Sequence, residues 1–516
     1  MSATGLLVAT ALGVAVAGPD HTWAEPQNQR PPATEARVRT MVPDLESYIA
    51  LGMKSFDVPG LAIGIVANDR LVYARGFGVR SRRDGAPVDP ATVFQIGSLT
   101  KAFLSATLAI AVDRGWLRWD DRVTDLDPGF QLKDPWVTRE FRVFDLLAQR
   151  SGLPPAANDG LELLGLDEAA LIHSLRYVEP VSSFRATFAY TNITHMIAGR
   201  IVAKASSAAQ WNEVLQKELF DPLGMGNSSC TAAEIVAAPN HAEGYRWTLQ
   251  GAVSVPFTSV VPYGFAGADD INSDVEDLAR WLRMQLDNGD FAGTRIVSAE
   301  NLLVTHTPRI AISDRFSYAM GWFVQQTPNG VIIWHNGTTP GFGAFLGMAP
   351  DRKTGVIVLS NEGNVGLPDS IGAWVLDRVL GNAKTDYLVE RLKRAKTSLT
   401  AAGEQYAKPV RPRLSPPGAT FAGSYANPDF GTAAVRMDGD ALIVELPETG
   451  AKLKLDPWDG DIFTATLMPS GPFAAVAANL GPSPYGFVQW QIDKTPKLDA
   501  FRLILGDDQA YEFRRR

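Results

Sequence analysis

The sequence predicts an α+β protein in which one antiparallel sheet is flanked by helices and followed by a small all-β barrel. Two observations support this fold class. Strand-like runs lie at both ends of the region before residue 383, with helical patterns between them, which suggests a single sheet packed by helices. From about residue 418 onward, short alternating strands are separated by frequent turns, and regular short strands suggest a closed barrel.

The first half of the chain supplies the opening strands and a helical middle. Residues 42–56 have helical spacing, and residues 60–80 read as two strands joined by an Asn-Asp turn. The stretch from about 98 to 300 is mostly helical, with loops rich in glycine and proline. Its clearest helix is the amphipathic segment at 278–290, LARWLRMQLDNGD, which ends near its glycine.

Four strand-like runs and one helix complete the predicted sheet domain. The helix is expected over residues 368–380. The strands are expected at residues 318–325, 331–335, 342–348 and 355–360.

The composition changes after residue 383. Residues 386–407 are helical and charged, and a cluster of prolines between residues 409 and 417 marks a stiff linker. Two Asp-Gly pairs in the tail are hairpin signals. We therefore expect a sheet-and-helix domain over residues 41–383, a helical and proline-rich linker over 384–417 and the barrel over 418–516.

The N-terminus, MSATGLLVATALGVAVAG, is apolar and rich in small residues. It predicts a signal peptide over residues 1–24, although no Lys or Arg precedes the apolar run. Residues 25–40 are expected to form a disordered leader. We therefore expect a periplasmic or secreted protein, with a cytoplasmic location as the alternative. No later stretch reaches the length of a membrane span.

Composition excludes several function classes. The 516 residues are 46% hydrophobic and 20% charged, as in soluble globular proteins, and the length suits two or three domains. The net charge of −8 argues against nucleic acid as a partner. The single cysteine, Cys230, excludes an intramolecular disulfide, and the six scattered histidines lack metal-ligand spacing. We expect neither a metal nor another cofactor.

Ser98 and Lys101 form the first candidate catalytic pair. They lie three residues apart at the start of an apolar run, so on a helix they share a face and the amine can reach the hydroxyl. A serine hydroxyl is a poor nucleophile until a base takes its proton, and a desolvated lysine can be that base. Residues 102–112 predict a buried helix. Alone, the motif also suits an N-cap serine followed by a solvated lysine.

Two further motifs follow downstream. Tyr-Thr-Asn at 190–192 lies in a loop before a helical pattern, and His-Asn-Gly at 335–337 lies between two strand-like runs. Taken singly, the first is typical of a turn and the second of a hairpin. Both motifs follow the Ser98 and Lys101 pair along the same chain. This order supports a functional interpretation more strongly than either motif does alone.

Together the three motifs resemble those of the serine beta-lactamase and penicillin-binding-protein superfamily. The resemblance is closest to its class C, esterase and D-aminopeptidase branch, where Tyr-x-Asn takes the middle place and His-x-Gly often replaces Lys-Thr-Gly. It covers roughly residues 40 to 380. It implies a mixed sheet domain with an inserted helical subdomain and the active site between them. The tail resembles the lipocalin-like domain attached to some family members.

The resemblance implies catalytic roles for three residues. Ser98 is the expected nucleophile, and Lys101 is its nearest base or charge partner. Tyr190 would complete the proton relay, as a phenolate whose pKa is lowered by Lys101. The sequence leaves open whether Lys101 or Tyr190 is the base.

Four further residues are expected to bind the substrate. Asn192 would donate to the substrate carbonyl and help to hold Lys101, and the backbone N–H groups of Ser98 and Thr338 would form the oxyanion hole. Gly337 would let the substrate approach the strand edge closely. His335 replaces a lysine and carries only partial charge near neutral pH, which favours neutral esters, amides or D-aminoacyl peptides over carboxylates.

A second Lys-Thr-Gly triplet at 353–355 is predicted to be the tip of a hairpin, because proline and aspartate precede it and a strand follows. The sequence thus predicts a serine hydrolase of ester or amide bonds, D-aminoacyl peptides and β-lactams included. Its substrate would be a small molecule or a short peptide. The alternative is a penicillin-recognising or peptidoglycan-sensing protein with little turnover. The barrel is a candidate surface for homo-oligomer contacts.

Overall fold

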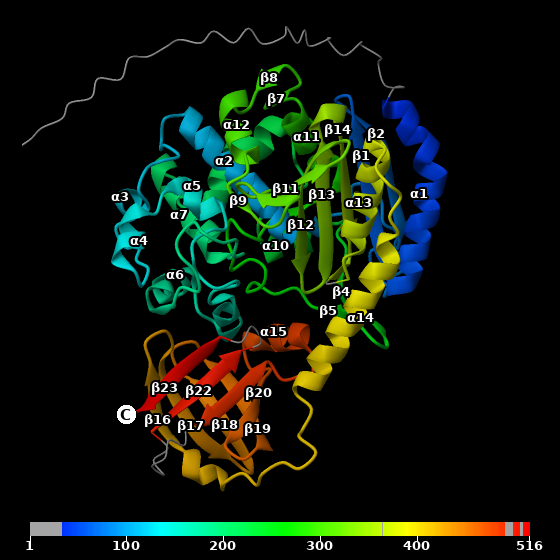
Figure 1. Ribbon diagram of the computed structural model, residues 1–516. Helices are drawn as coiled ribbons and strands as arrows, with labels where there is room; N and C mark the ends of the chain where they lie inside the picture. Colours follow the sequence, from blue (N-terminus) through cyan, green and yellow to red (C-terminus); the bar gives the residue numbers. More distant parts are fainter. Residues whose placement is uncertain (1–33, 364, 491–498, 506–508) are drawn as a thin grey trace, which may run out of the picture.

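A computed structural model describes residues 34–363, 365–490, 499–505 and 509–516. Figure 1 shows a larger unit of helices and sheet and, below it, a barrel. Helix α14 (Tyr387–Gln405) leads from one unit to the other along the side. Within the described residues, no helix is both long enough and apolar enough to cross a membrane.

The predicted N-terminal segments fall mostly outside the described residues. These are the signal peptide at 1–24 and residues 25–33 of the leader. The remainder of the leader prediction was wrong, because helix α1 (Thr34–Phe56) begins inside it. The apolar spacing continues toward the N-terminus from the predicted helix, and Val38 at the new end is fully buried.

The larger unit is built on one eight-stranded sheet with the strand order β2-β1-β14-β13-β12-β11-β10-β9. All its pairings are antiparallel, as predicted. Strand β1 pairs with β14, so the two ends of the domain lie side by side in the sheet, next to the edge strand β2. The strands are β1 (Gly60–Ala67), β2 (Arg70–Gly78), β9 (Ile310–Ala311), β10 (Phe316–Tyr318), β11 (Phe323–Thr327), β12 (Gly330–Thr339), β13 (Phe342–Ala349) and β14 (Thr354–Ser360).

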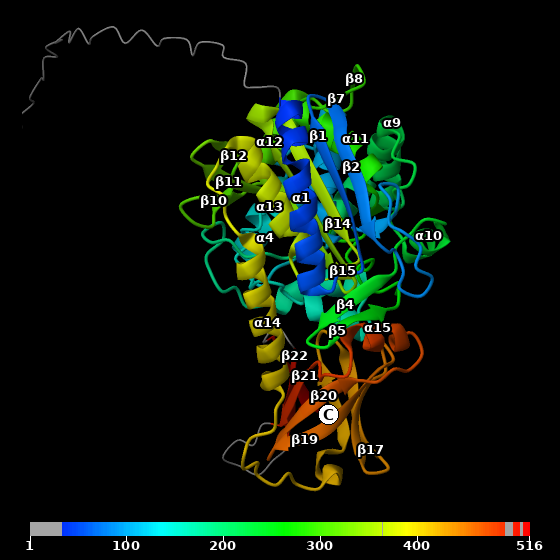
Figure 2. The same cartoon turned by 90° about the vertical axis from the view of Figure 1, so that its right-hand side faces the viewer.

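Helices cover both faces of this sheet. Successive side chains of a strand point to opposite faces, and both faces of β14 are buried. Val356 and Val358 pack with α1 and α13 (Leu367–Leu380), whereas Ile357 and Leu359 pack with α2 (Thr100–Asp113) and α11 (Val275–Leu286). Figure 2 shows α1 and α13 lying along their face of the sheet. This double burial explains the continuous apolar run of the strand.

Between α2 and α11 the chain forms the expected helical subdomain, which lies at one edge of the sheet in Figure 1. Its longest helix, α7 (Ile193–Ser206), packs against α2. The other helices there are α3 (Val123–Leu126), α4 (Pro135–Glu140), α5 (Val143–Leu147), α6 (Glu168–Ser174), α8 (Trp211–Leu215), α9 (Asp221–Leu223) and α10 (Ala232–Ala237). The remaining elements of the larger unit are α12 (Ala299–His306) and the short strands β3 (Phe94–Gln95), β4 (Gly244–Thr248), β5 (Gly251–Val255), β6 (Asn272–Ser273), β7 (Asp290–Phe291), β8 (Thr294–Arg295) and β15 (Glu362–Gly363).

Two strand predictions differ from the structure. The predicted strand at 318–325 is two strands, β10 and β11, because Gly321 between them has a φ of +73° and breaks the extended backbone. The His-Asn-Gly motif was expected between strands but lies inside β12. Its residues continue the ladder with β13, where Gly337 pairs with Ala344, and the turn comes later. The second Lys-Thr-Gly triplet is the predicted hairpin tip, with Lys353 at a φ of +47° between β13 and β14.

The tail forms the predicted closed barrel, and the described residues build it from eight antiparallel strands. Strand β16 pairs with β23 and thereby closes it. Its interior is filled by aromatic rings, including the fully buried Trp490, Phe501 and Phe513. Helix α15 (Phe473–Leu480) interrupts the strands and was not predicted. The strands are β16 (Gly423–Asn427), β17 (Gly431–Asp438), β18 (Ala441–Leu446), β19 (Ala451–Asp459), β20 (Ile462–Leu467), β21 (Gly486–Trp490), β22 (Ala500–Leu505) and β23 (Ala510–Arg515).

Candidate active site

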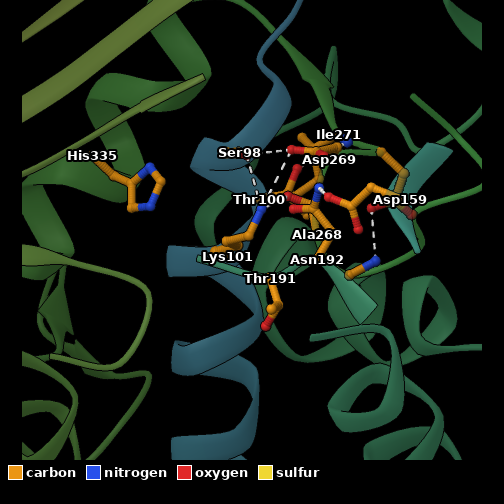
Figure 3. A network of polar contacts seen from close by, with 12 residues as sticks. Ser98, Thr100, Lys101, Asp159, Thr191, Asn192, Ala268, Asp269, Ile271 and His335 are labelled. Carbon is orange, nitrogen blue, oxygen red and sulfur yellow. Dashed lines mark hydrogen bonds and ion pairs between the residues drawn. The ribbon is translucent and has the colours of Figure 1, made fainter. Parts of the chain in front are cut away.

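The predicted nucleophile and its lysine are in contact. Ser98 lies in a single 3₁₀ turn (Gly97–Leu99) directly before α2, and Lys101 lies in the first turn of that helix. Because α2 is apolar on nearly all sides, it is buried, and Lys101 is 0% exposed. Its Nζ donates to Ser98 Oγ at 2.8 Å, as Figure 3 shows.

Lys101 is subject to two opposing electrostatic effects. Burial lowers the pKa of Lys101, since desolvation disfavours the ammonium form. The Asp269 carboxylate, whose Oδ1 lies 3.5 Å from Nζ, raises the pKa but offsets only part of the lowering by burial. Nζ also donates to the carbonyl of Ala268 at 3.1 Å and lies 4.8 Å from the centre of the Tyr190 ring. Lys101 is therefore held from several sides in a fixed position beside the serine.

Tyr190 is a neutral phenol rather than the predicted phenolate. Burial raises the pKa of Tyr190 well above its usual value, and the negative charge of Asp269 raises it further. A hydrogen bond with Ser98 acts in the opposite direction and does not reverse the shift. The hydroxyl thus carries its proton at neutral pH, which suits a proton donor better than a base.

Asp269 was missed by the sequence analysis. It lies in the loop before β6, and Ser98 Oγ donates a hydrogen bond to its Oδ1 (Figure 3). The next residue, Asp270, is bonded elsewhere, because its carboxylate accepts from Trp211 Nε1 and from the backbone of Gly267, each at 2.9 Å. The only sequence signal for an acid at this site was the pair Asp269-Asp270 before the amphipathic helix. The pair alone does not show which of the two carboxylates contacts the serine.

The Tyr-Thr-Asn loop is clamped by Gln149. The Gln149 side chain accepts from the Thr191 backbone N–H at 2.8 Å and donates to its carbonyl at 3.0 Å. Asn192 directly precedes α7, and its Nδ2 donates to Asp159 Oδ2 at 2.8 Å, where we expected a contact with Lys101. Asp159 is a second residue that the sequence analysis missed.

Two glycines allow the serine turn to lie against β12. A Cβ on Gly337 would lie 1.8 Å from the carbonyl oxygen of Ile96 and 3.0 Å from the Ser98 nitrogen. A Cβ on Gly97, which has a φ of +52°, would lie 2.8 Å from the Thr338 nitrogen. The backbone nitrogens of Ser98 and Thr338 are thus adjacent, as an oxyanion hole requires. The group that needs Gly337 is the chain's own carbonyl, whereas we expected it to be the substrate.

His335 does not carry the partial positive charge that the sequence analysis expected. It is 1% exposed, and burial together with the charge of Lys101 lowers the pKa of His335 to about 3. Its Nδ1 lies 2.6 Å from the Asn336 carbonyl, which only accepts, so Nδ1 carries the hydrogen and Nε2 accepts from Tyr318. Figure 3 shows the ring apart from the hydrogen-bonded network around Ser98. His335 packs beside the Tyr190 ring at 6.1 Å.

Carboxyl groups surround this centre. Glu162 is 2% exposed, and burial raises the pKa of Glu162 well above its usual value, with further increases from Asp159 and Asp269. In the part of the chain that the structure describes, no group of three His, Cys, Asp or Glu side chains is arranged to hold a metal ion. The acids that act on Lys101 are Asp159, Asp269 and Asp270.

The barrel touches the loop that carries Asp159. Gln509 donates to the carbonyl of Ala156 at 3.0 Å and accepts from the backbone N–H of Asn158 at 2.7 Å. Tyr511 donates to the Asn158 side chain at 2.9 Å, and Asn158 has a φ of +60°. The barrel therefore holds the backbone immediately before the aspartate that binds Asn192.

The sequence matches the Beta-lactamase family over residues 45–380 and the Domain of unknown function DUF3471 over residues 407–501. Unguisins hydrolase ungD from Aspergillus violaceofuscus (strain CBS 115571) is 25% identical in an alignment of 493 residues that covers 86% of this chain and 86% of that protein. The octameric penicillin-binding protein homologue from Pyrococcus abyssi is similar with a TM-score of 0.61 at 22% identity, over 92% of this chain and 100% of that chain.

The class C beta lactamase from Rhodobacter sphaeroides is similar with a TM-score of 0.55 at 23% identity, over 64% of this chain and 97% of that chain. These two structures share the fold with this protein. The family match covers more than half of the 516 residues, from residue 45 to residue 380. The chain therefore belongs to the beta-lactamase family.

Proposed function

We propose that this protein is a serine hydrolase that cleaves ester or amide bonds through an acyl-enzyme on Ser98. The observation that carries the proposal is the contact between Ser98 Oγ and the fully buried Lys101, whose Nζ lies 2.8 Å away. A buried amine beside a half-buried hydroxyl is costly for stability and useful for nucleophilic catalysis. Membership of the beta-lactamase family and likeness to a hydrolase support the same activity.

The arrangement around Ser98 supplies the remaining parts of an acyl-transfer site. Ser98 Oγ attacks the substrate carbonyl, and the backbone N–H groups of Ser98 and Thr338 receive the negative charge of the tetrahedral intermediate. Tyr190, which keeps its proton at neutral pH, stands beside Ser98 as a donor for the leaving group. Water then hydrolyses the acyl-enzyme at the same carbonyl carbon.

The charges near Ser98 favour substrates without a carboxylate beside the reacting bond. His335 is neutral because its pKa is lowered to about 3, so it offers no cation to an anionic substrate. The acids Asp159 and Asp269 lie close enough to act on Lys101 and would repel a substrate carboxylate. We therefore propose neutral esters, amides and D-aminoacyl peptides as the substrate class, ahead of penicillins.

A substrate panel tests this function. Initial rates are measured on a short-chain nitrophenyl ester, a D-aminoacyl anilide and a chromogenic cephalosporin, and intact mass is followed during turnover and after fluorophosphonate treatment. We expect turnover of the ester or the anilide to exceed that of the cephalosporin, and one fluorophosphonate adduct that maps to Ser98. A stable acyl adduct without turnover would instead support a penicillin-recognising sensor. No adduct and no turnover would contradict both.

The barrel contact leads to a separate prediction. Gln509→Ala removes two hydrogen bonds to the loop before Asp159, so we expect kcat to fall about tenfold, equivalent to ~1.4 kcal/mol of coupling, with little change in KM. The matched control is Lys454→Ala, whose ion pair with Asp456 stays within the barrel. Steady-state kinetics and thermal melting of both variants check this. Equal kinetics in the two variants would show that the barrel does not act on the site.

A further inference from the structure

We propose that Asp269 takes the proton from Ser98 during acylation. Lys101 acts as a cation that stabilises the negative charge developing on the serine oxygen. This inference rests on the proposed hydrolase function and names the base of that same site. The sequence left Lys101 and Tyr190 as the two candidates for the general base, and it did not suggest Asp269. Asp269 touches the reacting oxygen directly, so the role proposed for it is catalytic.

The directions of the hydrogen bonds support this assignment. Ser98 Oγ has one hydrogen, and it is donated to Asp269 Oδ1, because a carboxylate can only accept. Lys101 Nζ donates to the same serine oxygen at 2.8 Å. The serine therefore receives a hydrogen bond from the amine and gives its own to the carboxylate, which is the opposite of what a lysine base needs.

Among the described residues, every hydrogen bond of the lysine nitrogen is to an acceptor. The acceptors are Ser98 Oγ at 2.8 Å, the Ala268 carbonyl at 3.1 Å and Asp269 Oδ1 at 3.5 Å. An ammonium has three N–H groups to give, and three acceptors surround it. A neutral amine would turn its lone pair toward one of these acceptors, which is unfavourable. The geometry thus suits a charged Lys101 with no free lone pair for the serine proton.

The burial of Lys101 also supports a charged lysine paired with Asp269. An ammonium that is 0% exposed needs an opposite charge close by, and Asp269 supplies it across the shared serine. Burial is the larger effect and leaves the pKa of Lys101 below its usual value, whereas the carboxylates of Asp269, Asp159 and Asp270 offset part of that shift. The other titratable groups that interact electrostatically with Lys101 or Asp269 include Tyr190, Tyr318, Glu162, His195 and His335.

The proposed step balances without any further reagent. As Ser98 Oγ forms its bond to the substrate carbonyl carbon, the O–H bond breaks and the proton moves to Asp269 Oδ1. The carbonyl π electrons move to the oxygen, which the two backbone N–H groups bind. When the tetrahedral intermediate collapses, the leaving atom departs with the bonding pair and takes the hydroxyl proton of Tyr190, and Asp269 returns the proton it holds to the Tyr190 oxygen. Water repeats the cycle on the acyl-enzyme and gives its proton to the restored carboxylate.

The deciding experiment compares Asp269→Asn with Asp270→Asn in the full chain. Asp270 is the adjacent acid and also acts on Lys101, but its carboxylate is bonded to Trp211 and not to Ser98. We measure kcat/KM on the nitrophenyl ester from about pH 5 to pH 9. We expect Asp269→Asn to lose about 10²- to 10⁴-fold at every pH, and Asp270→Asn to stay near the wild type.

A lysine base would give a different result. It must be neutral to act, so the rate would rise as the pH passes the pKa of Lys101. Removal of the Asp269 charge, which raises that pKa, would lower it and move the acid limb to lower pH with the maximal rate retained. That outcome would overturn the proposal.

Two further variants keep the test decisive. If Asp269→Asn fails to fold, as judged by thermal melting, Asp269→Glu replaces it, because it keeps a carboxylate and is expected to retain more activity than Asp269→Ala. Equal rates for Asp269→Glu and Asp269→Ala would overturn the proposal. If turnover is insensitive to Ser98→Ala, the hydrolase function itself fails. If turnover needs Ser98 but not Asp269, only this assignment fails.

Discussion

Replacement of Ser98 by alanine is expected to lower kcat roughly 10⁴- to 10⁶-fold, because it removes the oxygen that would form the acyl-enzyme. The fold should be unaffected, since alanine suits the same helical turn. Lys101 and Asp269 keep their ion pair at 3.5 Å, so no buried charge is left without a partner. Rates on the ester and loss of the fluorophosphonate adduct measure the effect.

A serine on the same helix serves as the control for Ser98→Ala. Ser105 is fully buried, and its hydroxyl has no hydrogen-bond partner within the described residues. Ser105→Ala therefore removes a hydroxyl from α2 without touching the site, and we expect near wild-type kinetics. Turnover by Ser98→Ala above one-hundredth of the wild-type rate would rule out Ser98 as the nucleophile.

Gly337→Ala is expected to give the second large loss, about 10²- to 10³-fold in kcat/KM, which is the typical cost of one oxyanion donor. The added methyl would lie 1.8 Å from the Ile96 carbonyl oxygen, so the serine turn and β12 must separate. That separation moves the N–H groups of Ser98 and Thr338 away from a common point. Steady-state kinetics measure the loss, and thermal melting reports any accompanying destabilisation.

The matched control for Gly337→Ala is Gly226→Ala. A Cβ on Gly226 would meet no atom within 4 Å among the described residues. We expect its kinetics and melting temperature to stay close to those of the wild type. Full activity in Gly337→Ala would mean that the contact between the serine turn and β12 does not form the oxyanion hole.

Local patterns allowed much of the fold to be predicted. The i to i+3 spacing of Ser98 and Lys101 and the apolar run after them depend on neighbours in the sequence, and both were interpreted correctly. The barrel strands followed from short alternating runs with turns between them. The predicted strand at 318–325 was not expected to divide into two strands. The division depends on the positive φ of Gly321, which is set by its tertiary surroundings.

The site was less predictable because its remaining parts come from distant segments. Asp269 lies 171 residues from Ser98, and no spacing rule connects the two. The neutral state of His335 depends on burial, which the sequence alone does not give. The pKa of Tyr190 was expected to fall because Lys101 is near, but burial and Asp269 raise it. Each of these errors concerns an environment rather than the identity of a residue.

The pairing of β1 with β14 has a consequence for biosynthesis. Gly60 donates to the Asn361 side chain at 2.7 Å across a separation of 301 residues. While the ribosome makes those residues, β1 has β2 beside it but lacks its other neighbour, and its apolar face has no cover. Such long-range pairings form slowly and leave the nascent chain open to aggregation. Slower translation at low temperature, or added chaperones, should therefore raise the yield of folded protein.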